Sequence, residues 1–93
     1  MQASFESTVA LPAGVALHAR PAATFVKTAL GFRSQLTVGL DGKVDSRVAN
    51  AKSILAVLAL GATGGTVLRL SAEGEDAPAA LEALASCVSG LVE

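Results

Sequence analysis

His18 and Arg20 are the residues of this 93-residue chain whose types and spacing could do chemistry together. Pro21 follows them, and because proline lacks an amide hydrogen it is tolerated in a helix only in the first turn. We therefore expect a helix to begin at about Ala19, with the His18 ring beside the free amides and the positive end of the helix dipole. A negative group carried on that ring would be stabilised there.

The chemistry that this arrangement favours is the transient attachment of a phosphoryl group to His18. The field at the helix start disfavours protonation of the ring, which leaves a nucleophilic nitrogen available. Arg20 could donate a forked pair of hydrogen bonds to phosphate oxygens, and the backbone at Ala19 and Arg20 would also bind phosphate. No acid, second histidine or metal-ligand set accompanies them, so a hydrolase, a metal or another cofactor is not expected. The ordinary alternative is that His18 is a helix cap or a residue at the edge of the core.

The length and composition predict one small domain over residues 1–93. Half of the chain is apolar (52%), which is enough for a single core. The longest apolar stretch, Ile54 to Ala62, is far shorter than the roughly 20 residues that span a bilayer, and the N-terminus has no basic-then-apolar signal pattern. We therefore expect a cytoplasmic protein without membrane insertion. The single cysteine, Cys87, fits a buried helical position.

Charge is distributed unevenly along the chain. Six of its seven lysines and arginines lie between Arg20 and Lys52, whereas the C-terminal part is mostly acidic. This predicts an electropositive region of surface. Without Trp or Tyr to stack bases the region is a poor nucleic-acid site, so an acidic protein surface is the expected partner.

Apolar periodicity, turn residues and caps predict an alternating order of elements. We expect strands at Ser4–Leu11, Ser34–Leu40, Val44–Val48 and Thr66–Ala72, and helices at Ala19–Leu30, Ile54–Leu60 and Ala77–Val92. Asp41 and Gly42 predict a two-residue hairpin turn, Gly31 a helix stop, and Asp76 a helix N-cap before Pro78. The order βαββαβα indicates an α+β fold, a four-stranded antiparallel sheet with three helices on one face.

The apolar positions predict which faces are buried. The core-facing positions expected on the first and last helices and on the second strand are Ala22, Phe25, Val26, Ala29, Leu30, Leu81, Leu84, Ala85, Val88, Leu91, Leu36, Val38 and Leu40. The helix at Ile54–Leu60 has too many apolar residues for one buried face, so some of them must be exposed.

The segment ALHARPAATFVKTALGF is similar to the active-site region of HPr, the histidine-containing phosphocarrier of the bacterial sugar phosphotransferase system. Further matching stretches are Gly42-Lys43, Ala51-Lys52-Ser53, Leu60-Gly61, Gly65-Thr66-Val67 and Ser71 to Asp76. The resemblance implies an open-faced β-sandwich and a monomer that is a carrier, not an enzyme. It further implies that His18 accepts phosphate on Nδ1 from enzyme I and passes it to the IIA domains of sugar permeases.

The resemblance also assigns roles around the helix that follows Ser53. Ser53 matches a regulatory serine that a dedicated kinase phosphorylates in some bacteria, which blocks the carrier and builds a surface for a transcription regulator. Ile54, Leu55 and Leu58 match positions that dock onto enzyme I and the IIA domains, and Lys27 would add to their positive rim. The alternatives are that Ser53 is only a helix cap and that the apolar residues are all core.

Three departures from the family pattern affect the expected site. Ala16 stands where the family commonly has glycine, which could change the loop geometry. Val15 stands where a polar residue is frequent, so a hydrogen bond near the site would be missing. About four additional residues, at Asp45 to Val48, predict a longer or bulged hairpin.

Two other functions remain open at this stage. The chain could be a regulatory HPr-like module that acts through Ser53 phosphorylation or through nitrogen-branch partners, with His18 unused. A generic ligand-binding domain is the other, although its glycine pattern resembles no nucleotide-binding loop.

Overall fold

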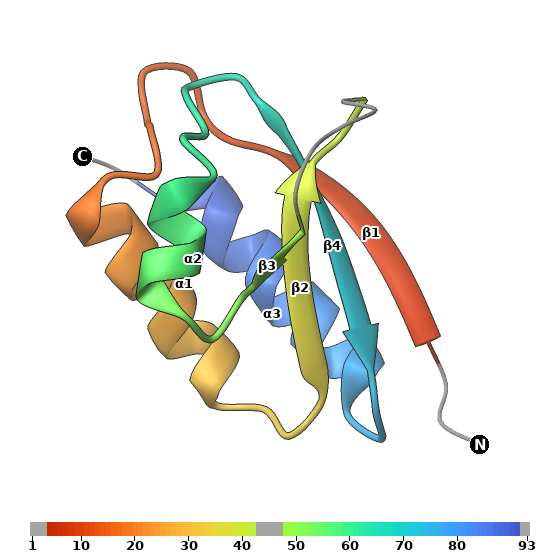
Figure 1. Cartoon of the computed structure of the whole chain (residues 1–93). Helices are drawn as coiled ribbons and strands as arrows, with labels where there is room; N and C mark the ends of the chain where they lie inside the picture. The colour runs from red at the N-terminus through yellow and green to blue at the C-terminus, as the bar shows by residue number, and fades with distance from the viewer. Residues whose placement is uncertain (1–3, 43–47, 92–93) are drawn as a thin grey trace.

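The computed structural model describes residues 4–42 and 48–91, and within them the elements follow the expected order. They are β1 (Ser4–Ala10), α1 (Ala19–Leu30), β2 (Gln35–Leu40), β3 (Ala49–Asn50), α2 (Ile54–Ala59), β4 (Val67–Glu73) and α3 (Ala77–Ser89). Figure 1 shows the strands as one layer and the three helices packed against one face of it.

The strands form one sheet in the order β1-β4-β2-β3, and every neighbouring pair is antiparallel. Strand β4 therefore lies between β1 and β2, with Leu70 paired to both Ser7 and Val38. This confirms the predicted α+β class, the antiparallel sheet and the helices on one face.

The core lies between the sheet and the helices. Because side chains alternate along a strand, Leu68, Leu70 and Ala72 of β4 face the helices, and all three are buried. Phe25 of α1 belongs to the same core cluster and is its largest fully buried side chain. The predicted core positions are mostly confirmed, but Leu30 is 62% exposed because it lies on the side of α1 that also carries the exposed Ala23 and Lys27, at the edge of the packed face. Ala85 is only half-buried.

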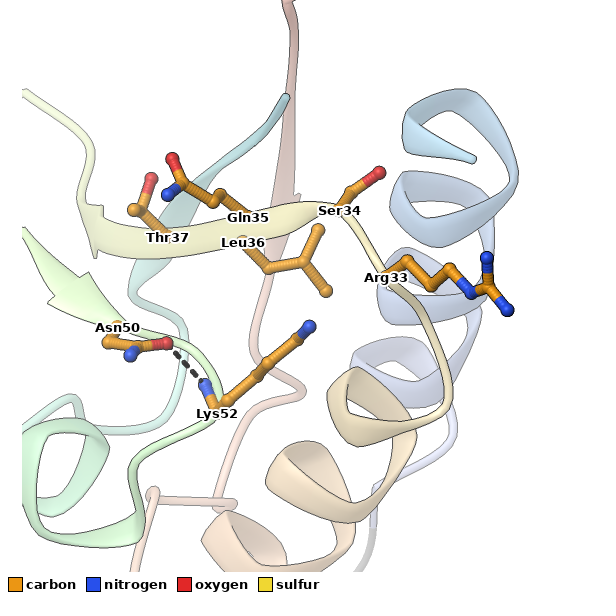
Figure 2. A pocket seen from close by; sticks show the side chains of 7 residues that line it. All are labelled: Arg33, Ser34, Gln35, Leu36, Thr37, Asn50 and Lys52. Carbon is orange, nitrogen blue, oxygen red and sulfur yellow. Dashed lines mark hydrogen bonds between the residues drawn. The ribbon is translucent and has the colours of Figure 1, made fainter. Parts of the chain in front are cut away.

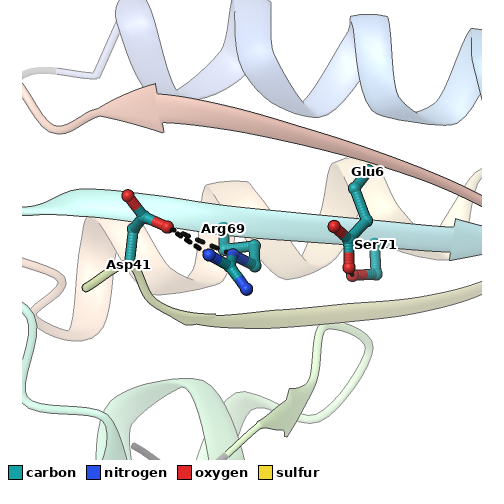
Figure 3. A network of polar contacts seen from close by, with 4 residues as sticks. All are labelled: Glu6, Asp41, Arg69 and Ser71. Carbon is teal, nitrogen blue, oxygen red and sulfur yellow. Dashed lines mark hydrogen bonds and ion pairs between the residues drawn. The ribbon is translucent and has the colours of Figure 1, made fainter. Parts of the chain in front are cut away.

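The other face of the sheet is polar and faces solvent (Figure 3). There the Arg69 guanidinium donates to Asp41 Oδ1 at 2.8 and 3.1 Å, and the Ser71 hydroxyl lies 3.5 Å from Glu6 Oε2. Solvent screens exposed ion pairs of this kind, which contribute at most about 1 kcal/mol to stability. This face therefore gives the sheet its solvent side and adds little to the core.

The predicted two-residue hairpin turn between β2 and β3 is wrong. Asp41 and Gly42 do form a turn, in which Gly42 has the positive φ of 81° that glycine favours. However, Val38 pairs with Ala49, so the connection is longer than a two-residue hairpin. Residues 44–47 of the predicted strand Val44–Val48, and most of the predicted four-residue extension, lie outside the described residues, and Val48 precedes β3.

The ends of α3 also differ from the prediction. Asp76 is at the N-cap position, but its carboxylate makes no capping hydrogen bond. It accepts instead from the Arg33 amide, the Ser34 amide and the Ser34 hydroxyl, across the chain. The helix ends at Ser89, before Gly90, and Val92 lies outside the described residues.

These hydrogen bonds affect the acidity of Asp76. The Ser34 hydroxyl, and after it the Arg33 amide, stabilise the charged carboxylate and hold the pKa of Asp76 below its ordinary value of 3.8. Asp76 therefore ties the start of α3 to the segment that leads into β2.

In the described part of the chain, no helix is long and apolar enough to cross a membrane.

Candidate functional site

His18 is the N-cap residue of α1, as the position of Pro21 predicts. Its backbone is extended (φ −79°, ψ −174°), and its carbonyl accepts the first helical hydrogen bond from the Ala22 amide at 2.9 Å. The amides of Ala19 and Arg20 precede that bond, and a helix provides no acceptor for amides in these positions. No acidic residue lies in the first turn of α1. The helix start therefore offers two donors and a positive field to an anion.

The His18 side chain is exposed and makes no capping hydrogen bond to α1. His18 thus occupies the N-cap position without a side-chain capping bond, and its exposure places it outside the buried core. Arg20 is exposed in the first turn of the same helix. Accordingly, the ring and the guanidinium project from neighbouring positions at the solvent side of the helix start.

The loop that leads to His18 is anchored by apolar residues. Leu11, Val15 and Leu17 are buried, at 2–7% exposure. Val15 thus contributes to the core, in place of the polar contact that the family pattern suggests. Within the described residues only glycines have positive φ, so Ala16 is in an ordinary conformation, and Gly14 (φ 84°) makes the turn. Alanine at position 16 therefore fits this loop without strain.

Two exposed basic residues lie along α1. Arg20 and Lys27 are seven residues apart, a spacing that places both on one face of a helix. Arg33 lies beyond the far end of α1, Lys43 and Arg47 lie outside the described residues, and Lys52 is half-buried. Arg20 and Lys27 are thus the described cations of this helix face.

The predicted docking residues lie on α2, which packs beside α1. Leu55 is 77% exposed and Ile54 is 37% exposed, whereas Leu58 is half-buried against the core. Val57 points inward and is fully buried. This confirms that the helix has more apolar side chains than the core accepts, and it limits the exposed apolar surface mainly to Ile54 and Leu55.

Ser53 is the N-cap of α2. Its hydroxyl accepts a hydrogen bond from the Ala56 amide at 3.3 Å, and the residue is partly exposed. The predicted cap is therefore present. The hydroxyl is also adjacent in sequence to the exposed Ile54 and Leu55, which places any charge added to it next to that apolar surface.

A shallow hollow of about 300 Å³ lies at the other end of α1 (Figure 2). The Lys52 ammonium there donates to the Phe32 carbonyl at 2.6 Å, and the Arg33 guanidinium points toward α3. At 1.5 Å rise per residue, the 12 residues of α1 separate this end from His18 by roughly 18 Å. The hollow is therefore not part of the His18 site. Its lining residues are Arg33, Ser34, Gln35, Leu36, Thr37, Asn50 and Lys52.

Metal-ligating groups do not gather anywhere in residues 4–42 and 48–91: no three His, Cys, Asp or Glu side chains come together. Cys87 is half-buried against the core, where the Thr28 hydroxyl approaches its sulfur at 3.5 Å.

The sequence did not predict one feature of the site, the contact between the loop before His18 and the segment after α2. Gly61, Gly64 and Gly65 mark that segment in the sequence, where they indicate only a break between elements.

Comparisons with known proteins show the family and the fold of this chain. A family model described as the PTS HPr component phosphorylation site matches residues 3–89. The phosphocarrier protein HPr of Haemophilus influenzae is 41% identical over 87 residues, which cover 94% of this chain and 98% of that protein. The crystal structure of a phosphocarrier protein HPr from Bacillus anthracis is 38% identical, with a TM-score of 0.81 over 92% of this chain and 98% of that one.

A longer protein also contains a similar segment. The multiphosphoryl transfer protein of Xanthomonas campestris pv. campestris is 40% identical over 87 residues, or 94% of this chain. The match covers only 10% of that protein's length.

Proposed function

Because this chain belongs to the HPr family of phosphotransferase-system phosphocarriers, we propose that its own phosphoryl group is carried on Nδ1 of His18. The chain is a carrier protein and not a catalyst, as the family shows. The observation that supports His18 is its position: an exposed ring at the N-cap of α1, directly before two amides that the helix leaves without an acceptor.

The proposed transfer needs few groups from this chain. With the ring proton on Nε2, the lone pair of Nδ1 attacks the phosphorus of the donor, and the bond from phosphorus to the donor breaks as the new bond forms. The amides of Ala19 and Arg20 and the Arg20 guanidinium would bind the phosphate oxygens and stabilise their charge. The reverse of these changes delivers the group to an acceptor.

We propose that the donor is enzyme I, that the acceptors are IIA domains of sugar permeases, and that the chain works as a cytoplasmic monomer. Docking would use the exposed part of α2, Ile54 and Leu55, with Leu58 behind them. Lys27 lies exposed on the neighbouring helix and would favour an acidic partner surface.

The test is a two-stage transfer assay. The chain is incubated with phosphoenolpyruvate and enzyme I and examined by intact-mass spectrometry, and the product is then mixed with a IIA domain. We expect one added phosphate on the wild type, none on His18→Ala, and loss of the phosphate when the IIA domain is added. Arg20→Ala should be phosphorylated more slowly. Equal labelling of the wild type and His18→Ala would contradict the proposal.

Ser53 supports a second candidate function, a regulatory module controlled by phosphorylation. Its partly exposed hydroxyl caps α2 beside Ile54 and Leu55. A phosphate there would add about two negative charges next to the docking surface. In this case a serine kinase and a transcription regulator, or nitrogen-branch proteins, would be the partners.

The two candidates predict opposite effects of the same substitutions. If the chain acts only as a regulatory module, His18→Ala leaves partner binding unchanged and Ser53→Asp alters it. If it acts as the carrier, His18→Ala abolishes transfer. Measuring binding and transfer for both variants, with the wild type as reference, therefore distinguishes them.

A further inference from the structure

The loop that carries His18 lies against the segment that follows α2. We call residues 11–18 the His18 loop and residues 61–66 the glycine loop. Figure 1 shows the two running side by side beyond the ends of the strands. Three backbone hydrogen bonds join them: Leu11 N to Thr66 O at 2.9 Å, Gly65 N to Leu11 O at 3.1 Å, and Leu17 N to Ala62 O at 3.0 Å.

The closest approach between the loops is at Gly64. A Cβ atom placed on Gly64 would lie 2.6 Å from the Gly14 nitrogen and 3.2 Å from the Val15 nitrogen. Both are backbone atoms, which cannot move aside as the end of a flexible side chain can. Gly64 does not have a positive φ, so the space, and not the backbone conformation, requires glycine here.

We infer that Gly64 is a positioning residue for His18: its lack of a side chain lets the glycine loop hold the His18 loop in the geometry needed for phosphoryl transfer. This inference rests on the proposal that His18 carries the phosphoryl group. Gly64 contacts no reacting atom and acts only through the loop that it supports.

The path from Gly64 to the ring is short and rigid. Gly14 turns the His18 loop with a φ of 84°, and the next residue, Val15, is anchored in the core. Leu17 is buried and is bonded to Ala62 directly before His18. Because the loop is fixed at both ends, a displacement of Gly14 is passed to Leu17, the residue that orients the His18 ring.

The test is the kinetics of Gly64→Ala as a substrate of enzyme I. Misplacement of a reacting group by about 1 Å costs up to about a hundredfold in rate. We expect kcat for phosphorylation to fall by about tenfold or more and KM to change by less than about twofold. KM is preserved because Ile54 and Leu55, at the start of α2, remain exposed for docking.

Gly42→Ala is the matched control. Unlike Gly64, Gly42 has open space around it, but its φ of 81° makes alanine strained there, in a turn far along the chain from His18. It should lower the melting temperature and leave kcat unchanged at a temperature where both variants are folded. If Gly64→Ala lowers the melting temperature but leaves kcat at the wild-type value, the inference is wrong. If the wild type itself is not labelled on His18, the proposed function fails instead.

A second measurement needs no variant and covers the case in which Gly64→Ala does not fold. Amide hydrogen exchange of the wild type should show the Leu11, Leu17 and Gly65 amides protected, because each donates across the two loops. Exchange of the Leu17 amide at the rate of an open loop would show that the glycine loop does not hold the His18 loop, and would overturn the inference.

Discussion

Replacing Leu55 by alanine should weaken docking to enzyme I without weakening the fold. The side chain is 77% exposed on α2. Full burial of a leucine side chain stabilises by about 1.5–3 kcal/mol, so a partner that covers the exposed part would gain about 1–2 kcal/mol from it. At 1.4 kcal/mol per tenfold, Leu55→Ala should raise KM for enzyme I by roughly five- to thirtyfold.

The same substitution should leave kcat nearly unchanged, because the contact is made equally in the bound ground state and in the transition state. Steady-state phosphorylation at varied chain concentration gives both constants, and urea unfolding gives the stability. We expect the free energy of unfolding to change by less than about 0.5 kcal/mol, since alanine is the better helix former and the exposed leucine packs little.

Val57→Ala is the matched control on the same helix, because Val57 is fully buried. It should lower the free energy of unfolding and leave KM close to the wild-type value. An unchanged KM for Leu55→Ala, or a loss of stability as large as that of Val57→Ala, would refute the assignment of the exposed part of α2 to docking.

Three further predictions concern the fold and its caps. Asp76→Asn should unfold at a lower urea concentration than the wild type at pH 7. Because the folded-state pKa of Asp76 lies below 3.8, the carboxylate's contribution to the free energy of unfolding is complete above that pH and is lost as the pH falls further. The urea midpoints of wild type and variant should therefore converge in acid. Phe25→Ala should cost about 3–5 kcal/mol of unfolding free energy, and Leu30→Ala less than about 0.5 kcal/mol, measured by urea titration. Ser53→Ala should cost about 1 kcal/mol, whereas Ser53→Asp should retain the cap and raise KM for enzyme I, because its charge adjoins Leu55.

Local patterns were sufficient to predict much of the fold. The bounds of α1 follow from Pro21 near its start and Gly31 at its end, and the alternation at Leu68, Leu70 and Ala72 indicates that β4 is a strand with one buried face. The order of the three helices is the order of their periodic apolar segments along the chain. These features depend on interactions between residues that are close in sequence, which is why composition and spacing reveal them.

The sequence predictions are wrong where residues far away in the sequence determine a side chain's contacts. Asp76 has the sequence pattern of a capping residue, but the amides of Arg33 and Ser34 compete for its carboxylate from more than forty residues away. Leu30 fits the apolar spacing of α1, yet it lies at the edge of the packed face beside the exposed Lys27, where the rest of the chain leaves it 62% exposed. Neither outcome can be obtained from a periodicity, because both depend on where the chain returns in space.

The candidate site shows the same division. His18 at the helix start was predictable, because Pro21 restricts where the helix can begin. The support for its loop was not, since the contact between Gly64 and Gly14 joins segments on either side of two strands and two helices. The glycine alone indicated only a turn.

The most direct test of the central claim is nitrogen-15 and phosphorus-31 NMR of the chain after reaction with phosphoenolpyruvate and enzyme I. The account predicts one phosphorus signal, coupled to Nδ1 of the His18 ring, that is lost when a IIA domain is added. A phosphorus signal that is not coupled to the His18 ring, or no signal under conditions in which another HPr is phosphorylated, would contradict it.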